Sequence, residues 1–229
     1  LWTAENRLRS GSRMGVVRRA SPLPDPLPKG PFRVSEALAL GVRRGRLKAA
    51  DLSKPYWGMR DPDPDPITFE RALDAATVLM TPDQAFSHDT AVRILGLPHP
   101  RLWTPAEGIH VVGPTPDSRI RRKGIVPHRG IERRSSTTVD GLTCIDGPTT
   151  WADLGATFAV DDLIVLGDAV AHWKKGVPLS VLQQLLADRH EARGVRRLRE
   201  ALPQVRTRSD SAMETRGRLM FVRGGLPEP

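Results

Sequence analysis

Hydrophobic residues recur at helical spacing in most of the second half of the chain, whereas shorter apolar runs occupy its middle. The runs at 109–113 and 123–129 predict strands, and residues 137–145 predict a hairpin because Asp140-Gly141 lies at their centre. Helical spacing and capping residues predict helices over 67–81, 86–97, 148–158, 160–173, 178–190, 194–205 and 211–225. This order predicts an α+β protein with a small α+β middle domain and a helical C-terminal region.

The first part of the chain has a different pattern. Five prolines fall within residues 20–31, and proline removes a backbone donor and restricts the residue before it. Residues 1–31 are therefore predicted to be a disordered, proline-rich tether. The following segment, 32–52, predicts two short helices separated by Gly41, which can adopt the left-handed conformation that ends a helix.

A short strand is predicted over 54–60. Helix, tight turn, basic helix and strand is the order of a winged helix-turn-helix, so residues 32–66 predict a DNA-binding unit of this kind with its linker. The unit is partial, because the proline-rich stretch occupies the place of the usual first helix. The linker DPDPDP (61–66) lacks the glycine and glutamate that a calcium-binding EF-hand loop needs, which favours an extended, solvated segment.

Composition and charge narrow the class of protein. Of the 229 residues, 39% are hydrophobic and 27% are charged, and the net charge is +9. The basic residues form stripes: residues 1–60 hold 13 basic and four acidic residues, and residues 101–135 hold eight and three. Such stripes suit separate surfaces that face a polyanion, although an arginine-rich coding bias explains part of them.

Cysteine content and hydropathy indicate the compartment. The single cysteine, Cys144, excludes an internal disulfide and favours the cytoplasm. No apolar run reaches the length of about 18 residues that a membrane span needs, so no membrane partner is predicted. The sequence shows no secretory leader at Leu1, and Met14 is an alternative start.

Two clusters of basic side chains are the strongest functional signal. One cluster is expected to point outward from the second N-terminal helix, where guanidinium and ammonium groups can contact phosphates and base edges. The other lies in the loop between the two middle strands, where a solvated loop is an equally good interpretation. The predicted DNA-binding residues are Arg43, Arg44, Arg46, Lys48, Arg121, Arg122 and Lys123.

Catalytic and metal-binding motifs are absent from the sequence. The six histidines are scattered without an HExxH pattern, one cysteine cannot build a CxxC zinc site, and no glycine-rich phosphate loop occurs. His88-Asp89 could act as an acid/base pair, but a capping or core role is favoured. Cys144 and His128 could form a nucleophile and base, but an inert buried thiol is favoured. We therefore expect no enzyme activity, no cofactor and no metal site.

Six segments occur in a fixed order along the chain: FRVSEALALGVRRGRL, FSHDTAVRILGLP, IHVVGP, GIVPHRG, VDGLTCIDGPTTWADLG and MFVRGGLPEP. In this order they resemble actinobacterial proteins related to the AbiEi-type antitoxin of type IV toxin-antitoxin systems, and the resemblance covers roughly residues 22–229. It implies an N-terminal winged helix-turn-helix that represses its own operon, with Arg43, Arg44, Arg46 and Lys48 on the recognition helix. It also implies an AbiEi-like α+β domain over 67–205 that opposes a nucleotidyltransferase-like toxin without a stable complex.

The last residues, 206–229, are similar to the first helix of very-short-patch-repair endonuclease domains. Glu214 matches the glutamate of that helix, and the remaining metal-binding residues would follow Pro229. This implies a truncated domain that cannot cleave DNA, since one carboxylate cannot organise the divalent ion. Alternatively, Ser211 and Glu214 form a helix capping box, S-x-x-E.

Three hypotheses follow from these observations. The leading one is a cytoplasmic, non-enzymatic DNA-binding transcriptional regulator of the antitoxin type, with double-stranded DNA and a toxin as partners. The alternative is an N-terminal fragment of an endonuclease-like protein without its catalytic core. The third is a protein-interaction scaffold.

Overall fold

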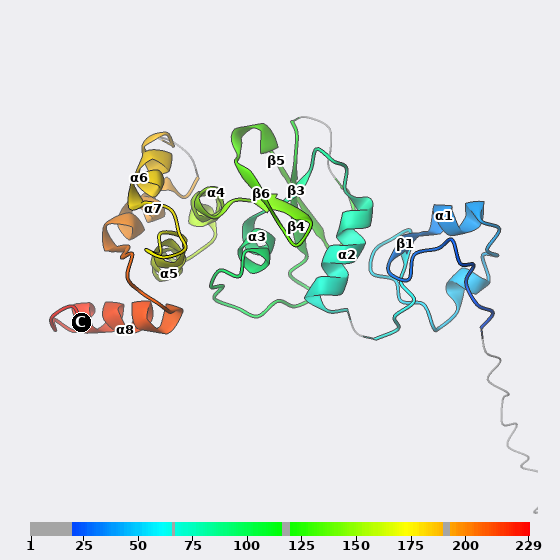
Figure 1. Ribbon diagram of the computed structural model, residues 1–229. Coiled ribbons are helices and arrows are strands. Elements are labelled where there is room, and N and C mark those ends of the chain that lie inside the picture. Colours follow the sequence, from blue (N-terminus) through cyan, green and yellow to red (C-terminus); the bar gives the residue numbers. More distant parts are fainter. Residues whose placement is uncertain (1–19, 66, 116–119, 190–192) are drawn as a thin grey trace, which may run out of the picture.

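The chain folds into a mixed α+β structure, which confirms the predicted class. The computed structural model describes residues 20–65, 67–115, 120–189 and 193–229. These residues form eight α-helices and two sheets, arranged as three parts in a row: a small N-terminal part, a five-stranded sheet with two helices, and a helical C-terminal part (Figure 1). In the described part of the chain, no helix has the length and apolar character needed to cross a bilayer.

The N-terminal part is built on a two-stranded antiparallel ribbon and one helix. Strand β1 (Phe32–Arg33) pairs with β2 (Met59–Arg60), and α1 (Val34–Ala39) follows β1 directly. The prediction of a free tether is wrong for residues 20–31, because Leu27 is buried in the core of this part. The apolar residues between the prolines supply that packing, and residues 1–19 lie outside the described part. The core residues are Leu27, Phe32, Ala37, Leu47 and Leu52.

The second N-terminal helix is the main difference from the sequence prediction. Gly41 ends α1 with φ +80°, as expected, but the basic segment forms only a single 3-10 turn, Arg46–Lys48. Gly45 precedes this turn and lowers helix propensity. Only Leu47 of the turn is buried, so packing does not compensate for that loss. The predicted α-helix over 42–52 is therefore wrong.

The predicted strand and linker after this turn are also shorter than expected. The strand comprises only β2, at the end of residues 54–60. Asp61 is buried at 3% exposure, is ion-paired with Arg71, and exchanges backbone hydrogen bonds with Ser53. The solvated-linker prediction is wrong at Asp61, because this carboxylate is used to attach the linker to α2.

The central sheet has the strand order β5-β4-β3-β7-β6. Strand β3 pairs antiparallel with β4 and parallel with β7, and β4 pairs parallel with β5. The predicted hairpin is confirmed: Asp140 and Gly141 both have positive φ, at 48° and 80°, and connect β6 to β7. The strands are β3 (Ala85–Phe86), β4 (Ile109–Gly113), β5 (Ile125–Arg129), β6 (Ser136–Val139) and β7 (Leu142–Ile145).

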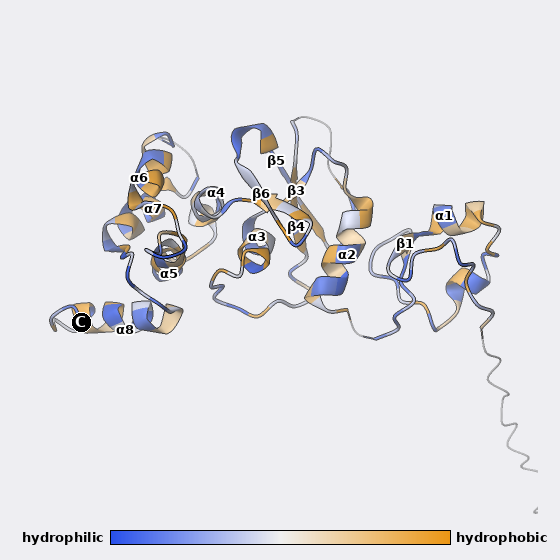
Figure 2. Cartoon of the chain, viewed as in Figure 1, coloured by the Kyte–Doolittle hydropathy of each residue, from blue (hydrophilic) through white to orange (hydrophobic). Residues whose placement is uncertain are grey.

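Two helices pack against this sheet, as their periodicity predicts. Helix α2 (Phe69–Leu79) begins at the cap residue Thr68 and buries its alanines in the same core as Ile109 and Ile125. Helix α3 (His88–Ile94) begins directly after β3 and ends before Gly96, whose φ is +64°. Figure 2 shows hydrophobic and hydrophilic residues on different parts of α2 and α6, as expected for amphipathic helices.

The C-terminal part is a group of helices around Trp151, as the sequence predicts. Trp151 is fully buried, and its indole Nε1 donates a hydrogen bond to the carbonyl of Leu163 at 2.9 Å. Asp146 caps the first helix of the group by accepting from the backbone of Thr149. The helices are α4 (Gly147–Asp153), α5 (Val160–Val170), α6 (Leu179–Ala187), α7 (Val195–Ala201) and α8 (Ala212–Arg223).

A buried carboxylate attaches α8 to α5. Asp168 is 1% exposed and accepts hydrogen bonds from Arg206 N (2.7 Å), Thr215 Oγ1 (2.7 Å) and Arg218 Nη2 (2.9 Å). Burial raises the pKa of this carboxyl, and the three donors oppose that rise. The predicted boundary between 67–205 and 206–229 therefore crosses a buried ion pair; as a domain boundary it stays a prediction.

Replacing the buried arginine on α8 is expected to destabilise the protein strongly. Arg218→Met leaves Asp168 buried without its charged partner, which costs about 3–5 kcal/mol. Arg216→Met is the matched control, because Arg216 lies on the same helix and pairs with Asp162 of α5, but is 42% exposed. Its loss is expected to cost less than about 1 kcal/mol. Urea denaturation measures both free energies of unfolding, and equal costs would contradict the role assigned to Asp168.

Candidate functional site

A basic hollow lies where the N-terminal part meets the central sheet. Its volume is about 1080 Å³, and no acidic side chain is found among the described residues that line it. Its walls come from α1, the segment before β2, and the loop that leads into β5. The basic side chains that line this basic hollow are Arg33, Arg44, Lys54, Arg60, Arg122 and Lys123.

Tyr56 fixes the relative position of the two walls. Its side chain is buried, and its hydroxyl donates a hydrogen bond to the Ala72 carbonyl of α2 at 3.2 Å. Its ring lies against Gly124, where an added Cβ would come within 3.0 Å of the ring. Burial raises the pKa of Tyr56, so the phenol stays protonated and keeps its donor at neutral pH.

The residue after Tyr56 in the sequence is an exposed aromatic residue, Trp57. Trp57 is 79% exposed, and the guanidinium carbon of Arg122 lies 5.1 Å from the centre of its ring. This is a cation-π distance. A charged group and a flat apolar surface are thus presented together at the edge of the basic hollow.

Five of the six basic residues of the hollow divide into two kinds, and the sixth, Arg122, donates to the carbonyl of Arg121 at 3.1 Å and lies over the ring of Trp57. Arg33 donates to the carbonyl of Val78 at 3.1 and 2.5 Å, and Arg60 donates to the carbonyls of Leu47 and Met59, so both hold the backbone together. By contrast, Arg44, Lys54 and Lys123 are exposed and make no hydrogen bond or ion pair within the described residues. Their positive charges are available to a ligand.

Tertiary structure brings together three of the seven residues predicted to bind DNA. Arg44 comes from the first predicted cluster, and Arg122 and Lys123 come from the second. The exposed residues Arg43, Lys48 and Arg121 are outside the lining of the basic hollow.

Arg46 does not point outward, so this expectation is wrong. Its side chain is 11% exposed and forms a two-point ion pair with Asp51 at 2.9 and 2.8 Å. Its Nε also donates to the carbonyl of Ser21 at 2.5 Å. Arg46 therefore holds the proline-rich segment and the 3-10 turn together.

A cluster of histidine side chains is the second candidate site. No sequence motif predicted it. Four of the five histidines in the described residues, which looked scattered in the sequence, lie in one region of the structure: His88, His99, His110 and His128. The fifth, His172, pairs with Asp210 at 2.8 Å in the C-terminal part. Neither β4 (IHVVG) nor β5 (IVPHR) alternates polar and apolar residues, so local pattern does not mark His110 and His128, and their adjacency depends on the strand order.

Burial sets the ionisation of this cluster. It lowers the pKa of His88 to about 4 and that of His128 to about 3, and it also lowers the pKa of His110. All three imidazoles are therefore neutral at pH 7. The acid/base pairing of His88 with Asp89, which the sequence analysis did not favour, is not what the structure shows, because Asp89 Oδ1 accepts from His99 Nε2 at 2.9 Å.

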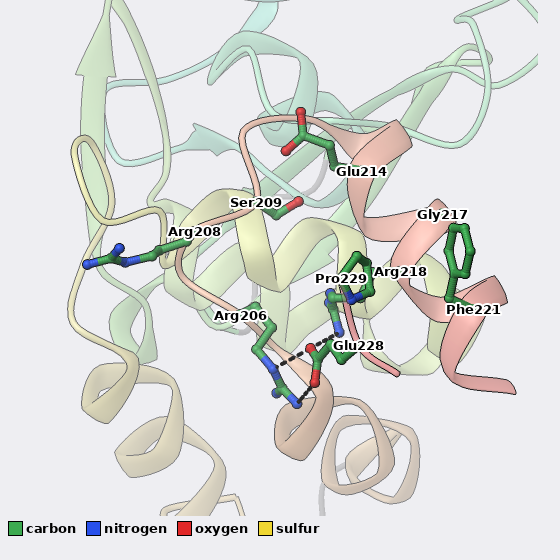
Figure 3. A pocket seen from close by; sticks show the side chains of 9 residues that line it. All are labelled: Arg206, Arg208, Ser209, Glu214, Gly217, Arg218, Phe221, Glu228 and Pro229. Carbon is green, nitrogen blue, oxygen red and sulfur yellow. Dashed lines mark hydrogen bonds and ion pairs between the residues drawn. The ribbon is translucent and has the colours of Figure 1, made fainter. Parts of the chain in front are cut away.

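Cys144 and Glu214, the two other side chains considered for a chemical role, have structural roles in the fold. Cys144 is buried in β7, and burial raises the pKa of its thiol to about 11, which confirms the prediction of a buried, protonated thiol. Glu214 accepts from Asp210 N at 2.8 Å, and Ser211 Oγ accepts from Glu214 N at 3.2 Å. Glu214 lies at the start of α8, away from the Arg206–Glu228 ion pair (Figure 3). Ser211 therefore caps α8 as predicted, whereas Glu214 accepts from Asp210 N and not from Ser211 N, as a full capping box would require.

Comparisons with known proteins give no family for this chain. No protein-family model matches it, and no curated protein matches it. Its function is therefore argued from the geometry of its own residues and from the resemblance in its sequence.

The different environments of Arg44 and Arg46 predict different effects of the same substitution. Arg46→Ala removes three hydrogen bonds and is expected to lower the free energy of unfolding by about 1–3 kcal/mol. Arg44→Ala is expected to change it by less than about 0.5 kcal/mol, because the side chain is exposed and without partners in the described residues. Thermal and urea denaturation of both variants check this. An unaffected Arg46→Ala variant would contradict the internal role of Arg46.

Proposed function

We propose that this chain is a DNA-binding transcriptional regulator of the AbiEi-like antitoxin type, and that the basic hollow is its contact with duplex DNA. The observation that carries this proposal is the meeting of two basic segments that are more than 70 residues apart in the sequence. Arg44 and Arg122 line one hollow with no acidic neighbour among its described residues. Phosphate binding needs such a concentration of unpaired positive charge.

The N-terminal part supports a reduced form of the winged helix-turn-helix. Helix α1, the turn at Gly41, the basic 3-10 turn and the β1–β2 ribbon follow the order of that motif. In place of a recognition helix, the basic turn and the loop before β5 would contact the phosphates. Phosphate contacts position a protein but carry little sequence information. We therefore expect salt-sensitive binding with a modest sequence preference.

The biological context of the proposal comes from the resemblance alone. A nucleotidyltransferase-like toxin, opposed without a stable complex, is the partner that the AbiEi-like family implies. On the same ground we propose a cytoplasmic, non-enzymatic protein that represses its own operon. Glu214 is exposed and caps the start of α8, which gives no support to a nuclease function.

Removing three positive charges of the basic hollow is expected to weaken binding to duplex DNA and to make it less sensitive to salt. The test variant carries Arg44→Ala, Arg122→Ala and Lys123→Ala. Each lost phosphate contact lowers the slope of log affinity against log salt by about 0.9, so the triple variant is expected to lose about 2–3 units of slope. Fluorescence anisotropy of a labelled duplex, titrated at several salt concentrations, measures this slope.

A second triple variant controls for net charge. Lys174, Lys175 and Arg208 lie in the C-terminal part, where Lys174 and Arg208 approach the exposed ring of Trp173 at 4.6 and 5.7 Å. Replacing all three by alanine removes the same charge but leaves the basic hollow intact. Affinity and slope are expected to stay at the parent values. Equal losses in both variants would show that only overall charge matters and would reject the proposed interface.

A further inference from the structure

Three imidazole side chains from three separate elements converge next to the central sheet. His88 is the first residue of α3, His110 lies in β4 and His128 lies in β5. Each offers one nitrogen, and these nitrogens lie within 4.8 Å of one another. We propose that His88, His110 and His128 form a binding site for a divalent transition-metal ion of the zinc type, a property independent of the proposed DNA binding.

The sheet itself places two of these ligands side by side. In the parallel β4–β5 pair, Val112 lies opposite His128 and His110 lies opposite Val126. Side chains two residues apart on a strand share a face, so His110 and His128 are diagonal neighbours on one face. His110 Nδ1 and His128 Nε2 share a hydrogen bond at 3.0 Å, which an ion bound by both nitrogens would replace. Two nitrogens on a tetrahedral zinc ion with bonds of 2.0–2.1 Å are about 3.3 Å apart.

The third imidazole is held in place by an unusual backbone conformation. His88 has φ +49°, in the left-handed region that costs a residue with a side chain about 1–3 kcal/mol. This conformation lays its ring on that of His128, with centroids 3.6 Å apart and planes inclined by 14°. The nitrogen lone pairs of stacked rings point along parallel lines, so the proposed site requires the His88 ring to turn about its side-chain bonds until its nitrogen and that of His128 face one ion. Within the described residues its buried Nδ1 has no hydrogen-bond partner, nor does the buried hydroxyl of Ser87 before it. Buried polar atoms without partners are uncommon, and a ligand at this place would supply a partner for His88 Nδ1.

A carboxylate lies behind the cluster, as it does behind many metal-binding histidines. His110 turns Nδ1 toward the cluster, and its Nε2 is 3.8 Å from Asp89 Oδ2. The other oxygen of Asp89 is fixed by His99 Nε2 at 2.9 Å. A carboxylate that holds the second nitrogen of a ligand imidazole sets its tautomer and orientation. The 3.8 Å contact is longer than a hydrogen bond, so it is part of the proposal that Asp89 closes on His110 Nε2 when the ion binds and then positions its ring.

The ligand set selects the class of ion. Imidazole nitrogens favour zinc, copper, nickel and iron over calcium and magnesium, which prefer oxygen ligands. Three protein ligands leave a fourth position for water, as in open zinc sites. The site contains neither of the sequence motifs HExxH and CxxC, because its ligands come from three separate elements that only the fold brings together.

Metal binding is tested on the full-length chain after treatment with a chelator and dialysis. We expect one Zn²⁺ per chain by elemental analysis at pH 7.5, and visible Co²⁺ absorption bands that Zn²⁺ abolishes. Each of His88→Gln, His110→Gln and His128→Gln is expected to weaken Zn²⁺ affinity by more than about 100-fold. Asp89→Asn is expected to weaken it by about 10–100-fold.

Two further variants separate metal ligation from a structural role of the stacked rings. His128→Cys keeps a ligand at this position, so it is expected to bind Co²⁺ and to add a thiolate-to-cobalt charge-transfer band. His172→Gln, outside the cluster, is expected to bind like the parent. Circular dichroism without metal checks that each variant is folded. A parent that binds no Zn²⁺, folded glutamine variants that bind it as tightly as the parent, or a folded His128→Cys variant without the new band would overturn the site.

Discussion

The pairing of the two-residue strand β3 is the constraint on which the middle of the molecule depends. Phe86 pairs with Val111 of β4 on one side and with Cys144 of β7 on the other. Buried backbone groups must be paired, so this short strand fixes both halves of the sheet. It also fixes where the chain enters α3, because Ser87 N donates to the carbonyl of His110 at 3.0 Å. The position of His88 beside β4 follows directly.

The basic hollow depends on a second set of contacts, between the N-terminal part and α2. Arg33 donates to Val78, Tyr56 donates to Ala72, and Asp61 pairs with Arg71. These contacts use charged and aromatic side chains for structure, so not every arginine in a basic segment is available to a ligand. Arg46 is the clearest case, because its guanidinium is hydrogen-bonded to Asp51 and to the carbonyl of Ser21. Net charge alone therefore overstates the number of residues that can bind a phosphate.

Both functional proposals concern polar groups that the fold brings together from distant parts of the chain and leaves only partly paired within the described residues. In the basic hollow these are exposed cations with no acidic neighbour among the described lining residues. In the histidine cluster they are neutral imidazoles beside a buried nitrogen that lacks a partner within the described residues. Elsewhere in the described structure, groups such as Asp168 and Asp153 are well paired with arginines.

The sequence by itself determined the α+β class, most of the helices, the hairpin at Asp140-Gly141 and the helix end at Gly41, because these follow from local periodicity and from glycine's freedom at positive φ. It overestimated the second N-terminal helix, where charge pattern suggested a helix but Gly45 and the scarcity of apolar residues opposed one. Only the tertiary structure decided which side chains meet. His110 and His128 are neighbours because β4 and β5 are, and Arg44 meets Arg122 because Tyr56 docks on α2 and Gly124. Such contacts join residues far apart in the chain, and local sequence patterns carry no information about them.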